Sequence, residues 1–297
     1  MSIFVVIFNT KMRFSYYFVF LTLIFQSCVS NGSTSQSNVS TTSKAVVQPP
    51  AFNADSAYSY IDRQVAFGPR VPNSAAHKRC AAYLSDQLTL TGAKVTKQNM
   101  ELKAFNGDLL SSVNIIGTFQ PEKKDRIVLF SHWDSRPWSD HDANPSNRNK
   151  PVDGANDGAS GVGILLEIAR QIGQKNPAIG VDIVFFDAED YGAPADYNGD
   201  AEDSWCLGSQ YWSKNPHIPG YQAKYGILLD MVGAPGATFY KESISMEYAS
   251  HVVEKVWGTA STLGFGSYFL NETGGAITDD HLYVNQLAGI PTIDIIQ

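Results

Sequence analysis

Three nearly continuous apolar runs constrain the fold of this 297-residue chain more than any other feature. They read RIVLFS at 126–131, VDIVFF at 181–186 and YGILL at 225–229. A strand that is apolar at almost every position needs cover on both faces, which is typical of a parallel sheet between two layers of helices. Stretches with helical periodicity separate the runs, as parallel connections require. The sequence therefore predicts an α/β fold with three layers, α/β/α, around a mostly parallel, twisted central sheet.

The rest of the chain supplies the other elements of this fold. The loop 133–156 is long and polar, and the chain stops directly after its last apolar strand, with no closing helix. We therefore expect the domain to be truncated at its C-terminus. Helices are expected at 54–67, 73–91, 160–174, 208–215, 244–263 and 279–287, and further strands at 95–104, 113–118 and 291–296.

Residues 1–28 have the pattern of an export signal. The apolar run FSYYFVFLTLIFQSC follows two basic residues and ends at Cys28. A cysteine in that place is typical of a bacterial lipoprotein, anchored to a membrane through a lipidated Cys28; simple secretion and an uncleaved anchor are the alternatives. Residues 29–50, rich in Ser, Thr and Asn, predict a flexible linker before a domain at 51–297. The protein is expected in the periplasm, or membrane-anchored, in a bacterial envelope.

The charge distribution bears on the kind of binding partner, and the two remaining cysteines bear on disulfide formation. The formal net charge is −7, and Lys and Arg are scattered rather than clustered, which argues against a nucleic-acid partner. Export would permit a disulfide between Cys80 and Cys206. A buried thiol is the more common outcome for a cysteine in a helical pattern, such as Cys80, so both alternatives stay open.

Acidic and histidine side chains follow the predicted strands at the points where the strands end. The carboxyl ends of parallel strands meet at one edge of a sheet, and ligands bind there. Burying several carboxylates together is costly unless a cation compensates, and carboxylates with histidine suit zinc. The sequence therefore predicts a zinc site at this edge. The residues gathered there are His132, Asp134, Asp157, Asp187, Glu189, Asp190, Asp230, Asp279, Asp280 and His281.

Four motifs, GANDGASG, FFDAEDYG, LLDMVGA and DDH, occur in this order and resemble the zinc aminopeptidase superfamily, in particular its glutaminyl cyclase branch of bacterial type. The resemblance covers about residues 54–297 and includes AFGPRVPNS, an opening shared by the cyclases. It implies the phosphorylase/hydrolase-like fold of the zinc exopeptidases. It also implies an enzyme that acts on peptides or proteins with N-terminal glutamine, forming pyroglutamate and releasing ammonia.

The resemblance implies a role for each matching residue. Asp157 and Asp190 match zinc ligands. Glu189 matches the general acid/base, and Asp230 and Asp279 match the aspartates that share protons with it. In an extended segment neighbouring side chains point in opposite directions, so the backbone near Glu189 and Asp190 must bend for both to face one site.

The metal ligands implied by the resemblance are incomplete in this sequence. The family's last zinc ligand is a histidine some distance after DDH, beyond residue 297. His281 is chemically suited to replace it, but its position in the motif looks structural, as does that of Asp187, which is expected to fix its loop. His132 matches a ligand of the second metal in di-zinc aminopeptidases and a retained, non-ligating residue in single-zinc cyclases. One zinc is therefore expected for a cyclase and two for an aminopeptidase.

Two enzymatic functions and a non-enzymatic binding role remain as alternatives. The cyclase is favoured by AFGPRVPNS and by Asp279, where peptidases commonly have serine. Tryptophans near the motif loops favour a small dry pocket for a glutamine side chain, with Trp205 as the main candidate and Trp133 as the second. In an aminopeptidase, Glu189 would instead activate the water that cleaves the first peptide bond.

Overall fold

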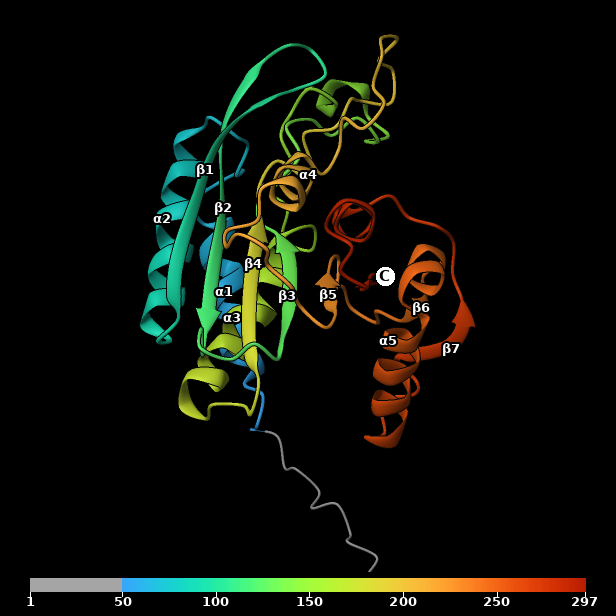
Figure 1. The fold of residues 1–297 in the computed structure, drawn as a ribbon. Helices are drawn as coiled ribbons and strands as arrows, with labels where there is room; N and C mark the ends of the chain where they lie inside the picture. The colour runs from blue at the N-terminus through green and yellow to red at the C-terminus, as the bar shows by residue number, and fades with distance from the viewer. Residues whose placement is uncertain (1–49) are drawn as a thin grey trace, which may run out of the picture. The chain divides into compact units, whose positions relative to one another are not determined.

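The computed structural model describes residues 50–297 (Figure 1). The predicted signal segment 1–28, with Cys28, lies outside the described residues, as does the predicted linker 29–50 except for its last residue. None of the helices in the described part of the chain is both long and apolar enough to cross a membrane.

Six strands pair into the central sheet, in the spatial order β1-β2-β4-β3-β5-β8. Neighbours among β4, β3, β5 and β8 run parallel, whereas β2 runs antiparallel to both β1 and β4. The predicted mostly parallel sheet is therefore confirmed, and the three apolar runs form its strands β3, β4 and β5. The strands are β1 (Lys94–Lys103), β2 (Leu109–Phe119), β3 (Arg126–His132), β4 (Gly180–Phe186), β5 (Gly226–Leu229) and β8 (Thr292–Ile295).

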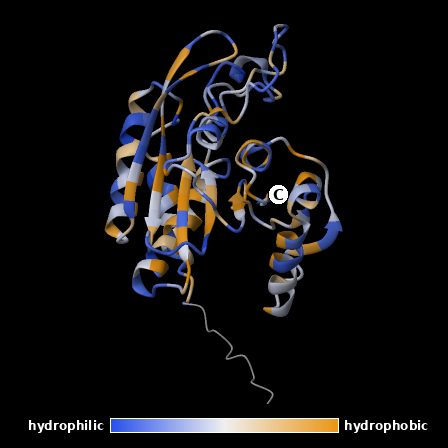
Figure 2. Cartoon of the chain, viewed as in Figure 1, coloured by the Kyte–Doolittle hydropathy of each residue, from blue (hydrophilic) through white to orange (hydrophobic). Residues whose placement is uncertain are grey.

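Helices cover both faces of this sheet, as the three-layer prediction requires. On one face Leu165 packs with Ile183 in a buried core, and on the other Trp212 packs against Phe130 and Phe186. Hydrophobic colour runs along the central strands, whereas the helices carry both hydrophobic and hydrophilic colour (Figure 2). The first face carries α1 (Ala54–Val65), α2 (Ala75–Leu90) and α3 (Ala159–Gln174), the second α4 (Leu207–Lys214) and α6 (Asp280–Tyr283), and α5 (Ser243–Thr262) packs against β8.

The structure differs from the predicted elements in two places. The predicted helix 279–287 divides into α6 and a π-helical turn, Val284–Ala288. Two strands that the sequence did not predict, β6 (Phe239–Lys241) and β7 (Phe269–Thr273), form a separate parallel pair. Both strands are short and partly exposed, so they lack a continuous apolar run. The long loop after β3 contains one 3-10 turn, Pro145–Asn147.

The first turn of α3 lies very close to the sheet at Gly161. A Cβ atom added there would overlap with the carbonyl oxygen of Leu229 and with Ser131 Oγ. This close approach holds the start of α3 against the ends of β3 and β5, where the predicted site residues lie.

We expect Gly161→Ala to lower the free energy of unfolding by about 1–3 kcal/mol, because the added methyl group overpacks this contact. Gly258→Ala, on the exposed side of α5, is the matched control: its Cβ would meet no atom within 4 Å. Helix propensity makes that control neutral or slightly stabilising. Denaturant unfolding measures both variants, and wild-type stability of Gly161→Ala would contradict the close packing.

Candidate active site

The loops after β3 and β5 and the turn before α3 meet at one edge of the sheet. His132 is the last residue of β3, Asp230 directly follows β5, and Asp157 lies in the turn before α3. The backbone N–H of Gly233 donates to Asn156 Oδ1 at 2.7 Å, which ties the turn before α3 to the loop after β5. Local backbone contacts therefore bring three predicted site residues together.

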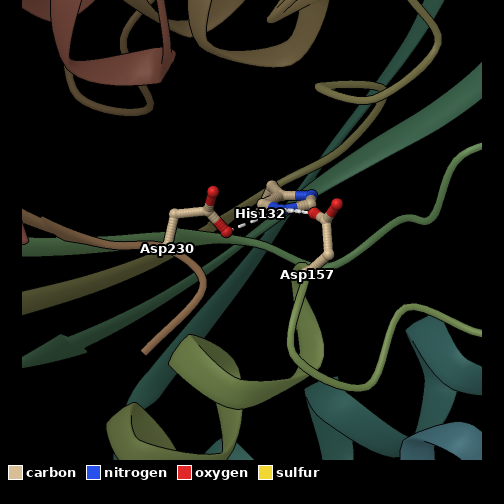
Figure 3. Close-up of side chains that lie close together, drawn as sticks. All are labelled: His132, Asp157 and Asp230. Atoms are coloured by element: carbon tan, nitrogen blue, oxygen red, sulfur yellow. Dashed lines mark hydrogen bonds and ion pairs between the residues drawn. The ribbon is translucent and has the colours of Figure 1, made fainter. Parts of the chain in front are cut away.

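His132, Asp157 and Asp230 form a tight cluster (Figure 3). His132 Nε2 lies 3.0 Å from Asp157 Oδ1 and 3.1 Å from Asp230 Oδ1. The cluster offers one imidazole nitrogen and two carboxylate oxygens, all within 4.8 Å of one another. This donor set and spacing fit a zinc ion, which binds imidazole nitrogen and carboxylate oxygen.

The electrostatics of this cluster favour a positive charge between the acids. Burial alone would lower the pKa of His132, but its hydrogen bonds with three aspartates raise it well above the usual range. Burial alone would raise the pKa of Asp157, yet its hydrogen bond with His132 lowers it. A metal ion would supply the same charge, and since a metal-binding imidazole must be neutral, metal binding here would displace the proton.

The predicted bend in FFDAEDYG occurs at Ala188, which has the positive φ of 53°. Asp187, just before it, is fixed by His77 Nε2, 2.9 Å from its carboxylate, and by the backbone N–H of Val113 at 2.6 Å. Asp187 thus anchors the start of the loop, as its predicted structural role requires. The bend separates it from the two acids that follow.

Asp134 holds those two acids in place. Its carboxylate accepts hydrogen bonds from the backbone N–H groups of Glu189 at 3.1 Å and Asp190 at 3.2 Å. The same carboxylate lies 3.4 Å from His132 Nδ1, so it connects the loop after β4 to the histidine of the cluster.

Glu189 is buried beside other acids. Its side chain accepts one hydrogen bond, at 3.3 Å, from the thiol of Cys206 to Oε1. Oε2 lies 3.8 Å from His132 Nδ1, and a carboxylate oxygen of Asp279 lies within 4.8 Å of the Glu189 carboxylate. Burial, with the charges of Asp190 and Asp279, raises the pKa of Glu189 well above the usual range even though His132 opposes this shift. A raised pKa makes the Glu189 carboxylate a stronger base than an ordinary glutamate, which suits a group that accepts a proton and passes it on.

Asp279 is the residue that precedes α6 and caps it, accepting a hydrogen bond from the backbone N–H of Asp280. Burial, and then the charge of Asp230, raise the pKa of Asp279 to about 6. Its Oδ2 has no hydrogen-bond partner among the described residues. Asp279 is therefore placed to share a proton with the acids around it.

Asp190 has a carboxylate oxygen without a hydrogen-bond partner. Its Oδ2 is buried and has no hydrogen-bond partner among residues 50–297. Burial, and then the charge of Asp157, raise the pKa of Asp190 well above the usual range. A nearby cation would offset this repulsion, and carboxylates such as those of Asp157 and Asp190 are of the type that zinc binds.

The two predicted pocket tryptophans lie in different environments. Trp205 is partly buried in the loop before α4 and stacks on the guanidinium group of Arg136. Trp133 has no exposed surface: its ring stacks on His77 at 4.4 Å, and its Nε1 donates to the carbonyl oxygen of Val113. The predicted substrate contact of Trp133 is not supported, because alternation along the chain turns its side chain away from His132 and into the core.

His281 is fully buried, and its Nε2 lies 3.1 Å from Glu242 Oε2. Glu242 also accepts the backbone N–H groups of Ser245 and Ile277, so it connects the start of α5 to the segment before α6. This contact agrees with a structural position for His281 in the DDH motif.

Three contributors to the site were not predicted: Arg136, Glu242 and the thiol of Cys206. Arg136 and Glu242 also have partners nearby in sequence, but the contacts of Arg136 with Asp190, of Glu242 with His281 and of Cys206 with Glu189 join segments that are distant in sequence. Cys80 and Cys206 are both buried free thiols.

The pKa of Asp279 predicts a pH dependence of stability. The value rises from 3.8 to about 6 on folding, so the contribution of Asp279 to the stability of the native state is fully present below pH 4 and is lost as pH rises through 6. Asp279→Asn keeps the capping oxygen and cannot ionise. We expect the metal-free variant to match wild type below pH 4 and to exceed it by on the order of 3 kcal/mol above pH 7. Parallel curves of unfolding free energy against pH, measured with a chelator present, would contradict the buried charge.

Comparison with known proteins identifies the family. Residues 114–297, more than half of the chain, match the model of peptidase family M28. The chain is 63% identical to a glutaminyl cyclase of known structure from Tannerella forsythia, with a TM-score of 0.82 and coverage of 84% of this chain and 85% of that one. It is 60% identical to a Zn-dependent exopeptidase from Parabacteroides distasonis, with a TM-score of 0.84 and coverage of 84% and 86%.

Curated relatives are more distant. The glutaminyl-peptide cyclotransferase of Bos taurus is 27% identical over 212 residues, which are 62% of this chain and 55% of that protein. The chain spans about half the length of the curated relatives it matches. These matches confirm the resemblance to the glutaminyl cyclase branch of the zinc aminopeptidase superfamily. The chain belongs to peptidase family M28.

Proposed function

We propose that this protein is a zinc-dependent glutaminyl-peptide cyclotransferase that converts N-terminal glutamine of peptides or proteins to pyroglutamate. The observation that supports this most directly is the buried Glu189 carboxyl group within 4.8 Å of the Asp279 carboxyl group. Two buried acids at this distance repel each other when both are ionised, which favours protonation of one of them and suits a reaction that moves a proton without consuming it. The similarity to glutaminyl cyclases at 63% and 56% identity supports the same choice.

Asp157 and Asp190 are the residues that would hold the zinc ion. The ion, when bound, supplies a Lewis acid that polarises the γ-carbonyl group of the substrate glutamine. The exposed face of Trp205 is the proposed wall against which the glutamine side chain packs.

Glu189 is the proposed proton carrier of the ring closure. The α-amine nitrogen attacks the γ-carboxamide carbon, a carbon–nitrogen bond forms, and the bond to the amide nitrogen breaks to release ammonia. Glu189 Oε2 would take the proton lost by the attacking amine and give it to the leaving nitrogen. Asp230 and Asp279 would keep this proton shared among the acids, so that Glu189 ends the cycle as it began.

An aminopeptidase is the second candidate, and one observation favours it. The cluster of His132, Asp157 and Asp230 has donor atoms suited to a metal ion of its own, as in the resemblance to di-zinc enzymes. Similarity to Zn-dependent exopeptidases points the same way. In that reaction Glu189 would accept a proton from the water that attacks the first peptide bond.

Two measurements on the purified protein separate these functions. A cyclase is expected to form pyroglutamate from a glutamine-initiated peptide, to leave a chromogenic leucine amide intact, and to contain about one zinc per chain. Leucine release without pyroglutamate, with two zinc ions per chain, would overturn the cyclase proposal in favour of the peptidase.

We expect Glu189→Gln to reduce pyroglutamate formation by about 10²–10⁴-fold, because the amide cannot carry the proton. Folding and zinc content are expected to stay at wild-type levels, since Glu189 is not one of the proposed ligands. Glu254→Gln, on α5 in an ion pair with Lys241, is the control and is expected to retain activity. Substantial turnover by Glu189→Gln would refute the proton-carrier role.

Export and membrane attachment through Cys28 remain proposals from the sequence of residues 1–28. A bacterial envelope would give such an enzyme access to peptides and proteins outside the cytoplasm.

A further inference from the structure

Arg136 is a buried cation in the loop after β3, with a relative exposure of 7%. Burying a guanidinium group is unfavourable unless each side of it finds a partner. Asp140 provides one partner in a bidentate pair: Nε lies 2.7 Å from Oδ1 and Nη2 lies 2.7 Å from Oδ2. This pair leaves Nη1 and the flat faces of the guanidinium group for other contacts.

The Nη1 group of Arg136 holds the backbone around the proposed ligand Asp190. It donates to the carbonyl oxygen of Asp190 at 3.2 Å and lies 3.6 Å from Asp190 Oδ1. Asp140 extends the same contact, because its Oδ2 accepts the backbone N–H of Ala195 at 3.0 Å. The ion pair therefore fixes both ends of the segment 190–195.

The face of the guanidinium group holds Trp205. The guanidinium carbon of Arg136 lies 4.4 Å from the centre of the Trp205 ring. On the backbone side Trp205 packs against Gly192, where an added Cβ would overlap with the indole ring. The indole therefore lies against both the cation and a residue of the segment 190–195.

We propose that Arg136 is a positioning residue that couples the metal ligand Asp190 to the pocket wall Trp205. The guanidinium group of Arg136 contacts both residues: its Nη1 edge positions Asp190, and its flat face positions the indole of Trp205. The distance between the proposed zinc site and Trp205 then depends on Arg136. The size of the substrate side chain that fits between them depends on it as well. This inference rests on the proposed function for the roles of Asp190 and Trp205, and it adds a determinant of substrate fit to that site.

Lysine is the informative replacement for Arg136. It keeps the positive charge but offers neither a bidentate edge nor a flat face. Arg148→Lys is the matched control, because Arg148 lies in the same loop and its Nε donates to the carbonyl oxygen of Asp142 instead. The same substitution at the two positions therefore separates the geometry of Arg136 from the loss of an arginine in this loop.

Zinc affinity is the first readout and needs no turnover. We expect Arg136→Lys to weaken zinc binding by about 10–100-fold in chelator competition, as is typical when the group supporting a metal ligand is changed. Arg148→Lys is expected to stay within twofold of wild type. Wild-type zinc affinity in Arg136→Lys would overturn the coupling to Asp190.

The split between KM and kcat is the second readout. At saturating zinc, Arg136→Lys is expected to raise KM for a glutamine-initiated peptide about tenfold or more, because Trp205 is displaced, with a smaller effect on kcat. An unchanged KM, or a loss in kcat alone, would overturn the coupling to Trp205. Absence of pyroglutamate formation by the wild-type protein would count against the proposed function, while the zinc readout would still test Arg136.

Asp140→Asn serves as the second variant if Arg136→Lys does not fold. It keeps Arg136 and its stacking on Trp205 but removes the charged partner that orients the guanidinium group. We expect weaker zinc binding by several-fold, with thermal unfolding measured to confirm the fold. Wild-type zinc affinity in a folded Asp140→Asn protein would also overturn the proposal.

Discussion

The mutual repulsion of buried carboxylates at one edge of the sheet is the constraint on which the rest of the structure depends. Burial raises the pKa of Glu189, Asp190 and Asp279, and neighbouring acids raise it further. Such a cluster is tolerable where positive charge lies among the acids or where some of the acids bind protons. His132 and Arg136 supply that charge, from opposite ends of the sequence HWDSR. The parallel sheet makes the arrangement feasible, because it ends several strands at one place.

The same side chains suit two proposed reactions, glutamine cyclisation and peptide hydrolysis. The two proposals differ in the number of metal ions that balance the acidic side chains. A second metal beside His132 would neutralise Asp157 and Asp230 and leave Glu189 to act on water. Without it, burial and the neighbouring charges favour protonated acids, and the pKa of Asp279 is raised to about 6. The chain resembles a glutaminyl cyclase and a Zn-dependent exopeptidase at similar identity, so one scaffold serves proteins of both descriptions.

Strands and acids could be predicted because their signals are local. RIVLFS and VDIVFF form β3 and β4 as their continuous apolar character predicted, and the motif acids lie at the strand ends. Closeness to His132 in sequence misplaced Trp133, because neighbouring residues of an extended segment point in opposite directions and Trp133 points into the core. The role of Arg136 was beyond reach for another reason: its partners lie up to 69 residues away, at Trp205, and only the folded loops bring them together.

The burial of the thiol beside Glu189 affects how it reacts with oxidants. Cys206 is fully buried, and burial with the nearby acids raises its pKa well above the usual range. A protonated, inaccessible thiol reacts slowly with oxidants and disulfides, because the thiolate is the reactive form. The hydrogen bond to Glu189 is thereby protected from oxidation without any reducing system. Such a thiol is compatible with the export that we propose from residues 1–28.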